Sequence, residues 1–112
     1  MAGRKSRNKG ARGEREFFAL LNAHLPPHLH IKRDLSQTRE GGLDGRSVAG
    51  VAIEVKRGER LALPKWLNQV RESANHDIGV LGYRQNRDDW HCLIDVSIPE
   101  LAEFIKWRER GR

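Results

Sequence analysis

The sequence predicts a single α/β domain in which helices flank a central mixed sheet of five strands. Three observations support this fold class. The 112 residues fit one domain. Apolar residues recur at helical spacing in three segments and form strand-like runs between them. These segments follow the order helix, three strands, helix, two strands, helix, without an internal repeat or linker, which is typical of one sheet covered by helices.

The chain begins with a basic segment that we expect to be a flexible arm. Residues 1–9 carry almost no apolar side chain, so they have little to bury, and residues 10–112 form the folded domain. The arm either follows a phosphate backbone or is simply solvated. Residues 11–24 predict a helix, because one side of it at about 100° per residue collects Phe17, Leu20, Leu21, His24 and Leu25. Pro26-Pro27 ends this helix.

Glu14 falls on the apolar side of this helix, whereas Glu16 faces outward. Glu14 precedes Phe17 by three residues and Leu21 by seven, and residues at these spacings share a helix face. A carboxylate that points inward is costly unless it is paired or bound to a charged group. Glu14 therefore either forms an ion pair with a basic residue at the edge of the core or belongs to a functional site.

The clearest strand is the run of residues 51–57. Side chains alternate along a strand, so one side carries Val51, Ile53 and Val55, and the other carries Ala52, Glu54 and Lys56. Upstream, residues 29–34 predict a first strand, residues 35–42 a polar loop, and residues 43–48 a brief second strand around Asp44. Gly50 breaks that strand before Val51.

The second half of the chain predicts a helix, a hairpin and a final helix. Pro64 suits the first turn of a helix whose inner side carries Trp66, Leu67, Val70 and Ala74, with Gln69 on its flank. Residues 78–83 and 90–96 predict two strands joined by a polar turn. Ser97 and Glu100 have capping-box spacing. The inner side of the third helix is then formed by Ile98, Leu101, Ala102 and Ile105, and its basic end, residues 107–112, is expected to fray.

The composition favours a polyanionic partner and a reducing compartment. Lys and Arg number 21 against 15 Asp and Glu, for a net charge of +6, which points to nucleic acid or to a merely soluble basic protein. The single cysteine, Cys92, excludes a disulfide within the chain, and its apolar surroundings predict a small core residue, not a nucleophile. No apolar run approaches the roughly 20 residues that cross a bilayer, so we expect no membrane contact and a cytoplasmic location.

The side of the strand that carries Glu54 and Lys56 is suited to phosphodiester hydrolysis. A divalent metal activates water and relieves negative charge in this reaction, and Mg²⁺ usually binds one or two carboxylates. Asp44 and Glu54 are the candidate acids, and the carbonyl of Val55 is a third oxygen. Lys56 would orient or deprotonate the attacking water or neutralise the phosphate. A lone Glu-x-Lys pair is usually a pair of surface charges, so the prediction depends on Asp44 and Glu14 as well.

A family resemblance is carried by Lys9-Gly10-Ala11-Arg12-Gly13-Glu14-Arg15-Glu16-Phe17, by Asp44, and by Ile53-Glu54-Val55-Lys56. These motifs resemble the archaeal-type Holliday-junction resolvases and their phage-encoded relatives, which belong to the PD-(D/E)XK nuclease superfamily. The resemblance extends from about residue 8 through the second helix. The sequence departs from the superfamily at Leu43, where proline is expected, and at Gly45, where an apolar strand residue is expected.

The resemblance implies a restriction-endonuclease-like sheet, a homodimer, Mg²⁺ dependence with Mn²⁺ as a substitute, and paired incisions in four-way DNA junctions during recombination or repair. It implies that Glu14, Asp44 and Glu54 are acidic site residues that hold the metal together with Val55, and that Lys56 is the catalytic lysine. Gln69 matches a glutamine often found near such sites. A phage or prophage origin is also implied, with action in the host cytoplasm.

Basic residues and one loop serine are the expected DNA contacts: Arg4, Lys5, Arg7, Lys9, Arg12, Arg33, Ser36, Arg39, Arg57 and Arg60. An apolar dimer patch is expected around Trp66, Phe104 and Trp107. Three hypotheses remain: a junction-resolving endonuclease, a nuclease of the same superfamily that acts on other DNA structures, and a non-catalytic nucleic-acid-binding module. A pure binder has no evident use for three acids in one site.

Overall fold

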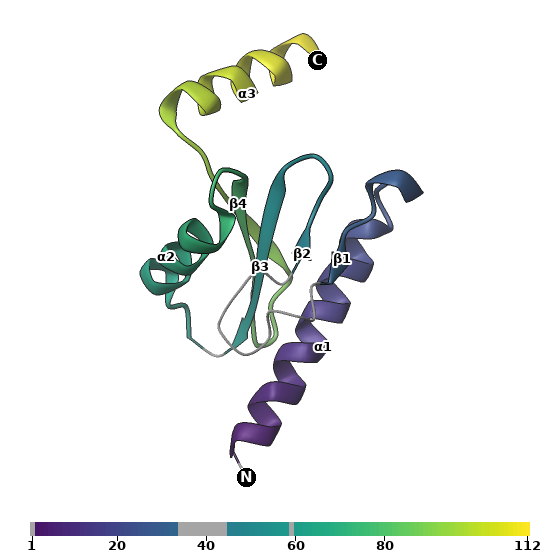
Figure 1. Ribbon diagram of the computed structural model, residues 1–112, viewed down its shortest axis with the longest axis vertical. Helices are drawn as coiled ribbons and strands as arrows, with labels where there is room; N and C mark the ends of the chain where they lie inside the picture. The colour runs from purple at the N-terminus through teal and green to yellow at the C-terminus, as the bar shows by residue number, and fades with distance from the viewer. Residues whose placement is uncertain (1, 34–44, 59) are drawn as a thin grey trace.

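A five-stranded mixed sheet with helices on both of its sides confirms the predicted fold class (Figure 1). The structure, a computed structural model, describes residues 2–33, 45–58 and 60–112, with side chains from Arg12 onward. The elements follow the predicted order: α1 (Ala2–Asn22), a 3-10 turn (Pro27–Leu29), β1 (Lys32–Arg33), β2 (Gly45–Arg46), β3 (Val51–Gly58), α2 (Leu63–Ala74), β4 (Ile78–Gln85), β5 (His91–Asp95) and α3 (Ile98–Arg110).

The strands lie in the sheet in chain order, and β3 and β4 form its longest pair. These two strands are parallel and α2 connects them, while the other neighbouring strands are antiparallel. In the parallel register Glu54 lies opposite Leu81 and Lys56 opposite Tyr83. Because β3 is hydrogen-bonded to strands on both of its edges, it is a rigid support for the side chains that it carries.

The side of the sheet that faces α1, called the α1 side below, holds the larger part of the core. Its buried cluster consists of Phe17, Phe18, Ile31, Ile53, Val55 and Val80. Phe17 lies directly over Gly82, where an added Cβ would come within 2.4 Å of the Phe17 ring. The predicted alternation of β3 is therefore confirmed, since Ile53 is 2% exposed and packs against the helix.

The opposite side, called the α2 side below, has a smaller core built from small residues. Ala52 and Ala74 pack together, and both Val70 and Leu81 are fully buried. Gly79 allows this close packing, because a Cβ there would lie 2.4 Å from Cγ1 of Val70. The predicted inner position of Val70 and Ala74 on this helix is confirmed.

Helix α1 is longer at its start than the sequence predicted. It begins at Ala2 and not at residue 11, so the segment expected to be a separate flexible arm continues the helix. Once a helix is anchored, each added residue costs little, and Lys, Arg and Ala extend it readily. At its other end, the Asn22 side chain donates to the carbonyl of Ile31 (3.0 Å) and accepts from the Ile31 N–H (2.8 Å), which fixes the chain reversal around the two prolines.

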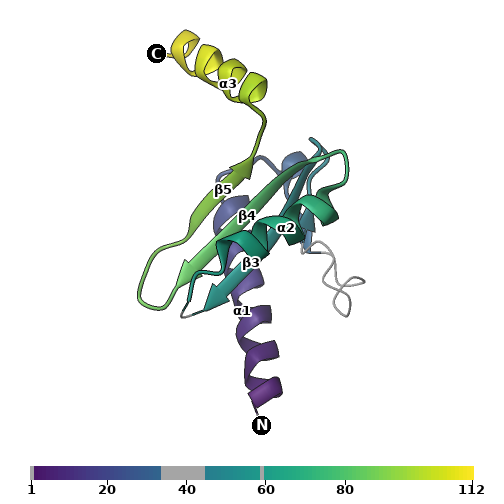
Figure 2. The same cartoon turned by 90° about the vertical axis from the view of Figure 1, so that its left-hand side faces the viewer.

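Helix α3 has the predicted capping box but not the predicted packing. The Ser97 hydroxyl accepts from the Glu100 N–H, and the Glu100 carboxylate accepts from the Ser97 N–H. The helix, however, stands away from the sheet (Figures 1 and 2), and Ile98 is 80% exposed. The expected inner side of α3 was therefore wrong. The expected core position of Cys92 was also wrong, because this residue is exposed on β5.

None of the helices among the described residues is both long and apolar enough to cross a membrane.

Candidate active site

Strand β3 places Glu54 and Lys56 together on the α2 side of the sheet, as the alternation predicted. Glu54 is 3% exposed and is the buried charged residue of the described chain. Lys56, one strand repeat further along, is partly exposed. Burial on a central strand fixes the carboxylate, whereas the lysine lies closer to the solvent-facing end of the same strand. The pair thus runs from the interior toward the surface.

Helix α2 carries Gln69 on the side of the sheet that also holds Glu54. The helix runs back along β3, and Ala74 packs on Ala52. Val70, the neighbour of Gln69, lies over Gly79, where an added Cβ would come within 2.4 Å of its Cγ1, and Gly79 is the β4 partner of Ala52. The Oε1 atom of Gln69 is buried and has no hydrogen-bond partner among the described residues. A buried carbonyl oxygen of this kind is suited to accept from a donor or a cation supplied by a ligand.

Glu14 adopts the ion-pair arrangement that the sequence left open. Its Oε2 accepts from Nη2 (2.8 Å) and Nε (3.2 Å) of Arg33 on β1, and its side chain is 20% exposed. Glu14 therefore lies beside the β1 edge of the sheet, and Arg33 is engaged within the chain. A carboxylate satisfied by an arginine is held in place whether or not it has a further role.

Three predicted residues, Asp44, Ser36 and Arg39, lie outside the described residues. Within residues 2–33, 45–58 and 60–112, no group of three or more His, Cys, Asp or Glu residues is placed to hold a metal ion. The donors that β3 and α2 do supply are the Glu54 carboxylate, the Gln69 amide oxygen and the Val55 carbonyl. All three are hard oxygen donors, and they fit the ligand chemistry of Mg²⁺.

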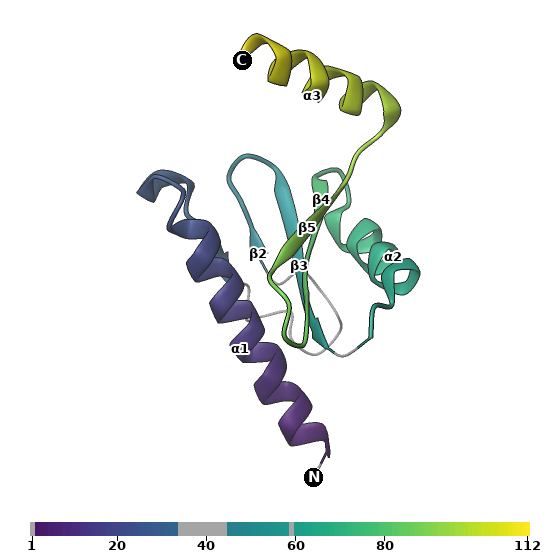
Figure 3. The ribbon, with the colours of Figure 1, turned by 180° about the vertical axis from the view of Figure 1, so that it is seen from behind.

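The basic residues gather at the end of the molecule where β3 ends. The first half of α1, which carries Arg4, Lys5, Arg7 and Lys9 in its sequence, runs past the strands at this end (Figures 1 and 3). Arg57 lies against Gly13 of α1, and a Cβ there would be 3.4 Å from the Arg57 Cβ. Arg12 and Arg60 are exposed. The half of α1 whose sequence is basic and the end of β3 with Arg57 thus lie at the same end of the molecule.

Sequence reasoning missed a polar cluster that fastens the β4–β5 hairpin to α1. The Oε1 of Glu16 accepts from Trp90 Nε1 at 2.7 Å and from Arg84 Nη1 at 2.5 Å. The Trp90 ring also packs edge-on against Phe17. The hydrogen bond from Trp90, aided by the charges of Arg84 and Arg57, lowers the pKa of Glu16 below its ordinary value. Helical periodicity turns Glu16 outward, and no local signal pairs it with residues 68 and 74 positions away.

Replacing Trp90 with phenylalanine tests this cluster, because the ring remains while the N–H donor is lost. A depressed carboxyl pKa stabilises the fold above the unfolded pKa, and this contribution is lost as pH falls through the folded value. We expect Trp90→Phe to lose roughly 1 kcal/mol at neutral pH. The difference from the parent should shrink below about pH 4.5. Urea unfolding at several pH values measures it.

The exposed Trp107 provides the matched control. Trp107→Phe should leave the pH dependence of stability unchanged. A Trp90→Phe penalty that persists undiminished at acid pH would show that packing, and not the Glu16 hydrogen bond, causes the loss.

Comparisons with protein-family models, with curated proteins and with solved structures found no match to this chain.

Proposed function

We propose that this protein is a metal-dependent endonuclease that cuts DNA at four-way junctions and acts as a homodimer. The observation that carries the proposal is the buried Glu54 on the central strand, with Lys56 following on the same side. A buried carboxylate requires compensating positive charge or hydrogen-bond donors. Burying one on a strand with neighbours on both sides costs desolvation free energy, which stability alone does not explain. This arrangement supports a catalytic role.

In the proposed site, each residue has a separate task. Glu54 supplies a fixed anionic oxygen, and Gln69 presents an amide oxygen from the facing helix. Lys56 places its side-chain nitrogen near the solvent-exposed end of β3, where a phosphate group could reach it. It would orient the attacking water or balance the charge of the phosphate.

The metal would be held by Glu54, the Val55 carbonyl, Asp44 and Glu14, with Mg²⁺ as the natural ion and Mn²⁺ as a substitute. When bound, such an ion makes water nucleophilic near neutral pH and stabilises the charge that develops on the phosphate. Glu14 would contribute through its Oε1, since the ion pair with Arg33 uses its Oε2.

Helix α1 supports the DNA-binding part of the proposal. Its basic first half extends past the sheet at the end where β3 delivers Lys56, so phosphates bound along the helix would approach the site. Each phosphate contact should add about −0.9 to the slope of log affinity against log salt on duplex DNA. Contacts of this kind position the substrate and do not read bases.

A second candidate is a non-catalytic nucleic-acid-binding module. The ion pair between Glu14 and Arg33 favours it, because an acid that is satisfied within the chain needs no metal. In this alternative the basic helix binds nucleic acid, and the protein catalyses no reaction.

The test is to incubate the protein with Mg²⁺ and, separately, a four-way junction, a duplex, a flap and a single strand of the same sequence. Symmetric cuts in two opposed strands of the junction are the expected result. Cuts confined to the other substrates would indicate a nuclease with a different preference. Binding without any cut, in both Mg²⁺ and Mn²⁺, would contradict the enzyme and leave the binding module.

A further inference from the structure

A continuous apolar surface runs from the edge of the sheet onto α3. Eight large apolar residues of this surface are between 37% and 80% exposed: Ile78, Ile94, Val96, Ile98, Leu101, Phe104, Ile105 and Trp107. Elsewhere in the described chain, the exposed large apolar residues are Leu20, Val48 and Leu61. The exposed apolar side chains are therefore concentrated in one region that follows β5 into α3.

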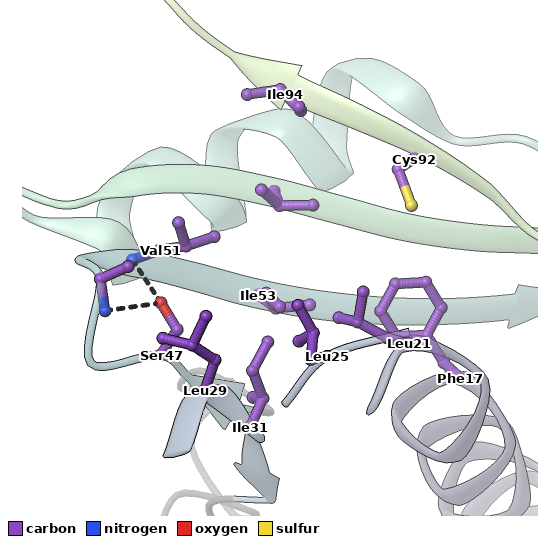
Figure 4. A pocket seen from close by; sticks show the side chains of 12 residues that line it. Phe17, Leu21, Leu25, Leu29, Ile31, Ser47, Val51, Ile53, Cys92 and Ile94 are labelled. Carbon is purple, nitrogen blue, oxygen red and sulfur yellow. Dashed lines mark hydrogen bonds between the residues drawn. The ribbon is translucent and has the colours of Figure 1, made fainter. Parts of the chain in front are cut away.

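Two apolar hollows on the α1 side of the sheet join to form a trough. The first, about 320 Å³, lies between the sheet and α1 together with the turn that follows it, and Figure 4 shows Phe17 and Leu21 of α1 and Leu25 of that turn on its wall. The second, about 470 Å³, lies between the sheet and α3. They share Val51, Val80 and Ile94, so they are continuous. We call this surface the sheet trough.

The polar groups that line the sheet trough are already engaged within the chain. The Ser47 hydroxyl accepts from the N–H groups of Ala49 and Val51 at 3.2 Å and 3.1 Å (Figure 4). The Glu100 carboxylate accepts from the N–H of Ser97 in the capping box. The trough thus presents carbon surface without unsatisfied partners of its own, and the complementary occupant is an apolar one.

Helix α3 carries more apolar surface than its own sheet can cover. At about 100° per residue, the arc from Phe104 through Leu101 and Ile105 to Ala102 spans about 160°. Leu101 and Phe104 line the sheet trough of their own chain, whereas Ile98 and Ile105 are 80% and 57% exposed. The ion pair of Glu103 and Lys106 at 3.1 Å marks the polar side. One part of α3 therefore remains available to another surface.

We propose that α3 of a second copy of this chain fills the sheet trough, and that the two copies exchange this contact symmetrically. Because each chain has both a trough and an apolar helix, one two-fold contact covers both, as isologous dimers do. The eight residues expose on the order of 800 Å² of apolar surface, taking about 200 Å² for a large side chain. Monomers seldom leave more than about 300–600 Å² in one patch, while a standard interface takes about 800 Å² from each partner.

The chain's own α3 does not take this place in the structure. The short connection after β5 and the capping box at Ser97 direct the helix away from the sheet, so it lines only the Ile94–Val96 end of the trough. The end bounded by Phe17 and Leu25 stays open. The proposal deepens the proposed function and rests on it in one respect: two opposed incisions need a pair of sites.

The first test measures the mass of the full chain by light scattering over a range of concentrations. We expect about 25.6 kDa, twice the 12.8 kDa of one chain. Phe104→Glu should give the single-chain mass with unchanged circular dichroism, because the exposed helix contributes little to the core. Leu20→Glu changes an equally exposed residue on α1 and should remain dimeric. A monomeric parent, or a dimeric Phe104→Glu protein, would overturn the proposal.

The second test uses Cys92, which lines the sheet trough and is the only cysteine of the chain. A Cys92→Ser, Ile105→Cys chain is mixed with a tagged parent chain and oxidised at alkaline pH, because burial raises the pKa of the Cys92 thiol. A mixed disulfide joining the two chains is expected. With Cys92→Ser, Leu20→Cys as the partner, that band should be absent.

The same reagents reveal the alternative arrangement. If Ile105→Cys in the presence of Cys92 closes a bond only within one chain, α3 folds onto its own sheet and the proposal is wrong. These measurements need neither DNA nor metal, so they separate the two proposals. A cross-linked dimer that cuts no DNA would contradict the nuclease proposal and support the dimer contact. Cleavage by a protein that is strictly monomeric would support the nuclease proposal and contradict the dimer contact.

Discussion

Glu54→Gln is expected to lower the rate of junction cleavage by about 100- to 1,000-fold, the scale on which the loss of one charge-stabilising group acts, because the proposed site loses an anionic metal ligand. Glutamine has the shape of glutamate, so the buried position beside β4 should remain filled and the fold should persist. The change removes the negative charge of the buried Glu54 carboxylate, which is a metal ligand in the proposed site. Single-turnover cleavage of a labelled junction in Mg²⁺ measures the rate, and binding to the same junction in EDTA should change less than about 3-fold.

Glu72→Gln is the matched control, since Glu72 is an exposed acid on α2 with the same charge. It should cut at the parental rate. If Glu54→Gln also retains that rate while binding normally, the buried acid serves the fold alone, and the proposed site must be abandoned.

Gly82→Ala is expected to destabilise the fold by roughly 3 kcal/mol, at the upper end of overpacking effects. The new Cβ would lie 2.4 Å from one atom of the Phe17 ring and 2.5 Å from another. Phe17 has little room to move, because its ring is 4% exposed and packs against both Phe18 and Trp90. A domain of this size is stable by about 5–15 kcal/mol, so the loss is a large fraction. Equilibrium unfolding in urea measures it.

Gly58→Ala provides the comparison, because no atom lies within 4 Å of a Cβ at that position. This change should cost little or add slightly to stability. An equal effect at both positions would mean that the lost flexibility of glycine, and not contact with Phe17, sets the result.

The order of the elements was predictable because local patterns determine it. Alternation in residues 51–57 identified β3, Pro64 identified the start of α2 within one residue, and the Ser97–Glu100 pair identified the start of α3. Each of these signals depends on neighbours in the sequence. The same holds for Glu54 and Lys56, whose shared side follows from strand geometry alone.

Contacts between distant residues were not predictable in this way. An apolar stripe shows that α3 needs a covering surface, but not whether that surface belongs to its own chain, so its inner side was assigned wrongly. The partners of Glu14 and Glu16 are Arg33, Arg84 and Trp90, which a helical projection cannot identify. Cys92 shows the same limit: the alternating pattern identified its strand, but it could not show how far that strand is covered, and Cys92 is exposed.

The elongated outline of the molecule, 52 Å along its longest axis, has α3 at one extremity and the basic start of α1 at the other (Figure 1). Two copies joined through α3 would thus hold the basic starts of their α1 helices at opposite ends of the dimer. A DNA molecule that contacted both helices would have to be branched or bent around the centre of the dimer. A short straight fragment would contact only one of the two helices at a time.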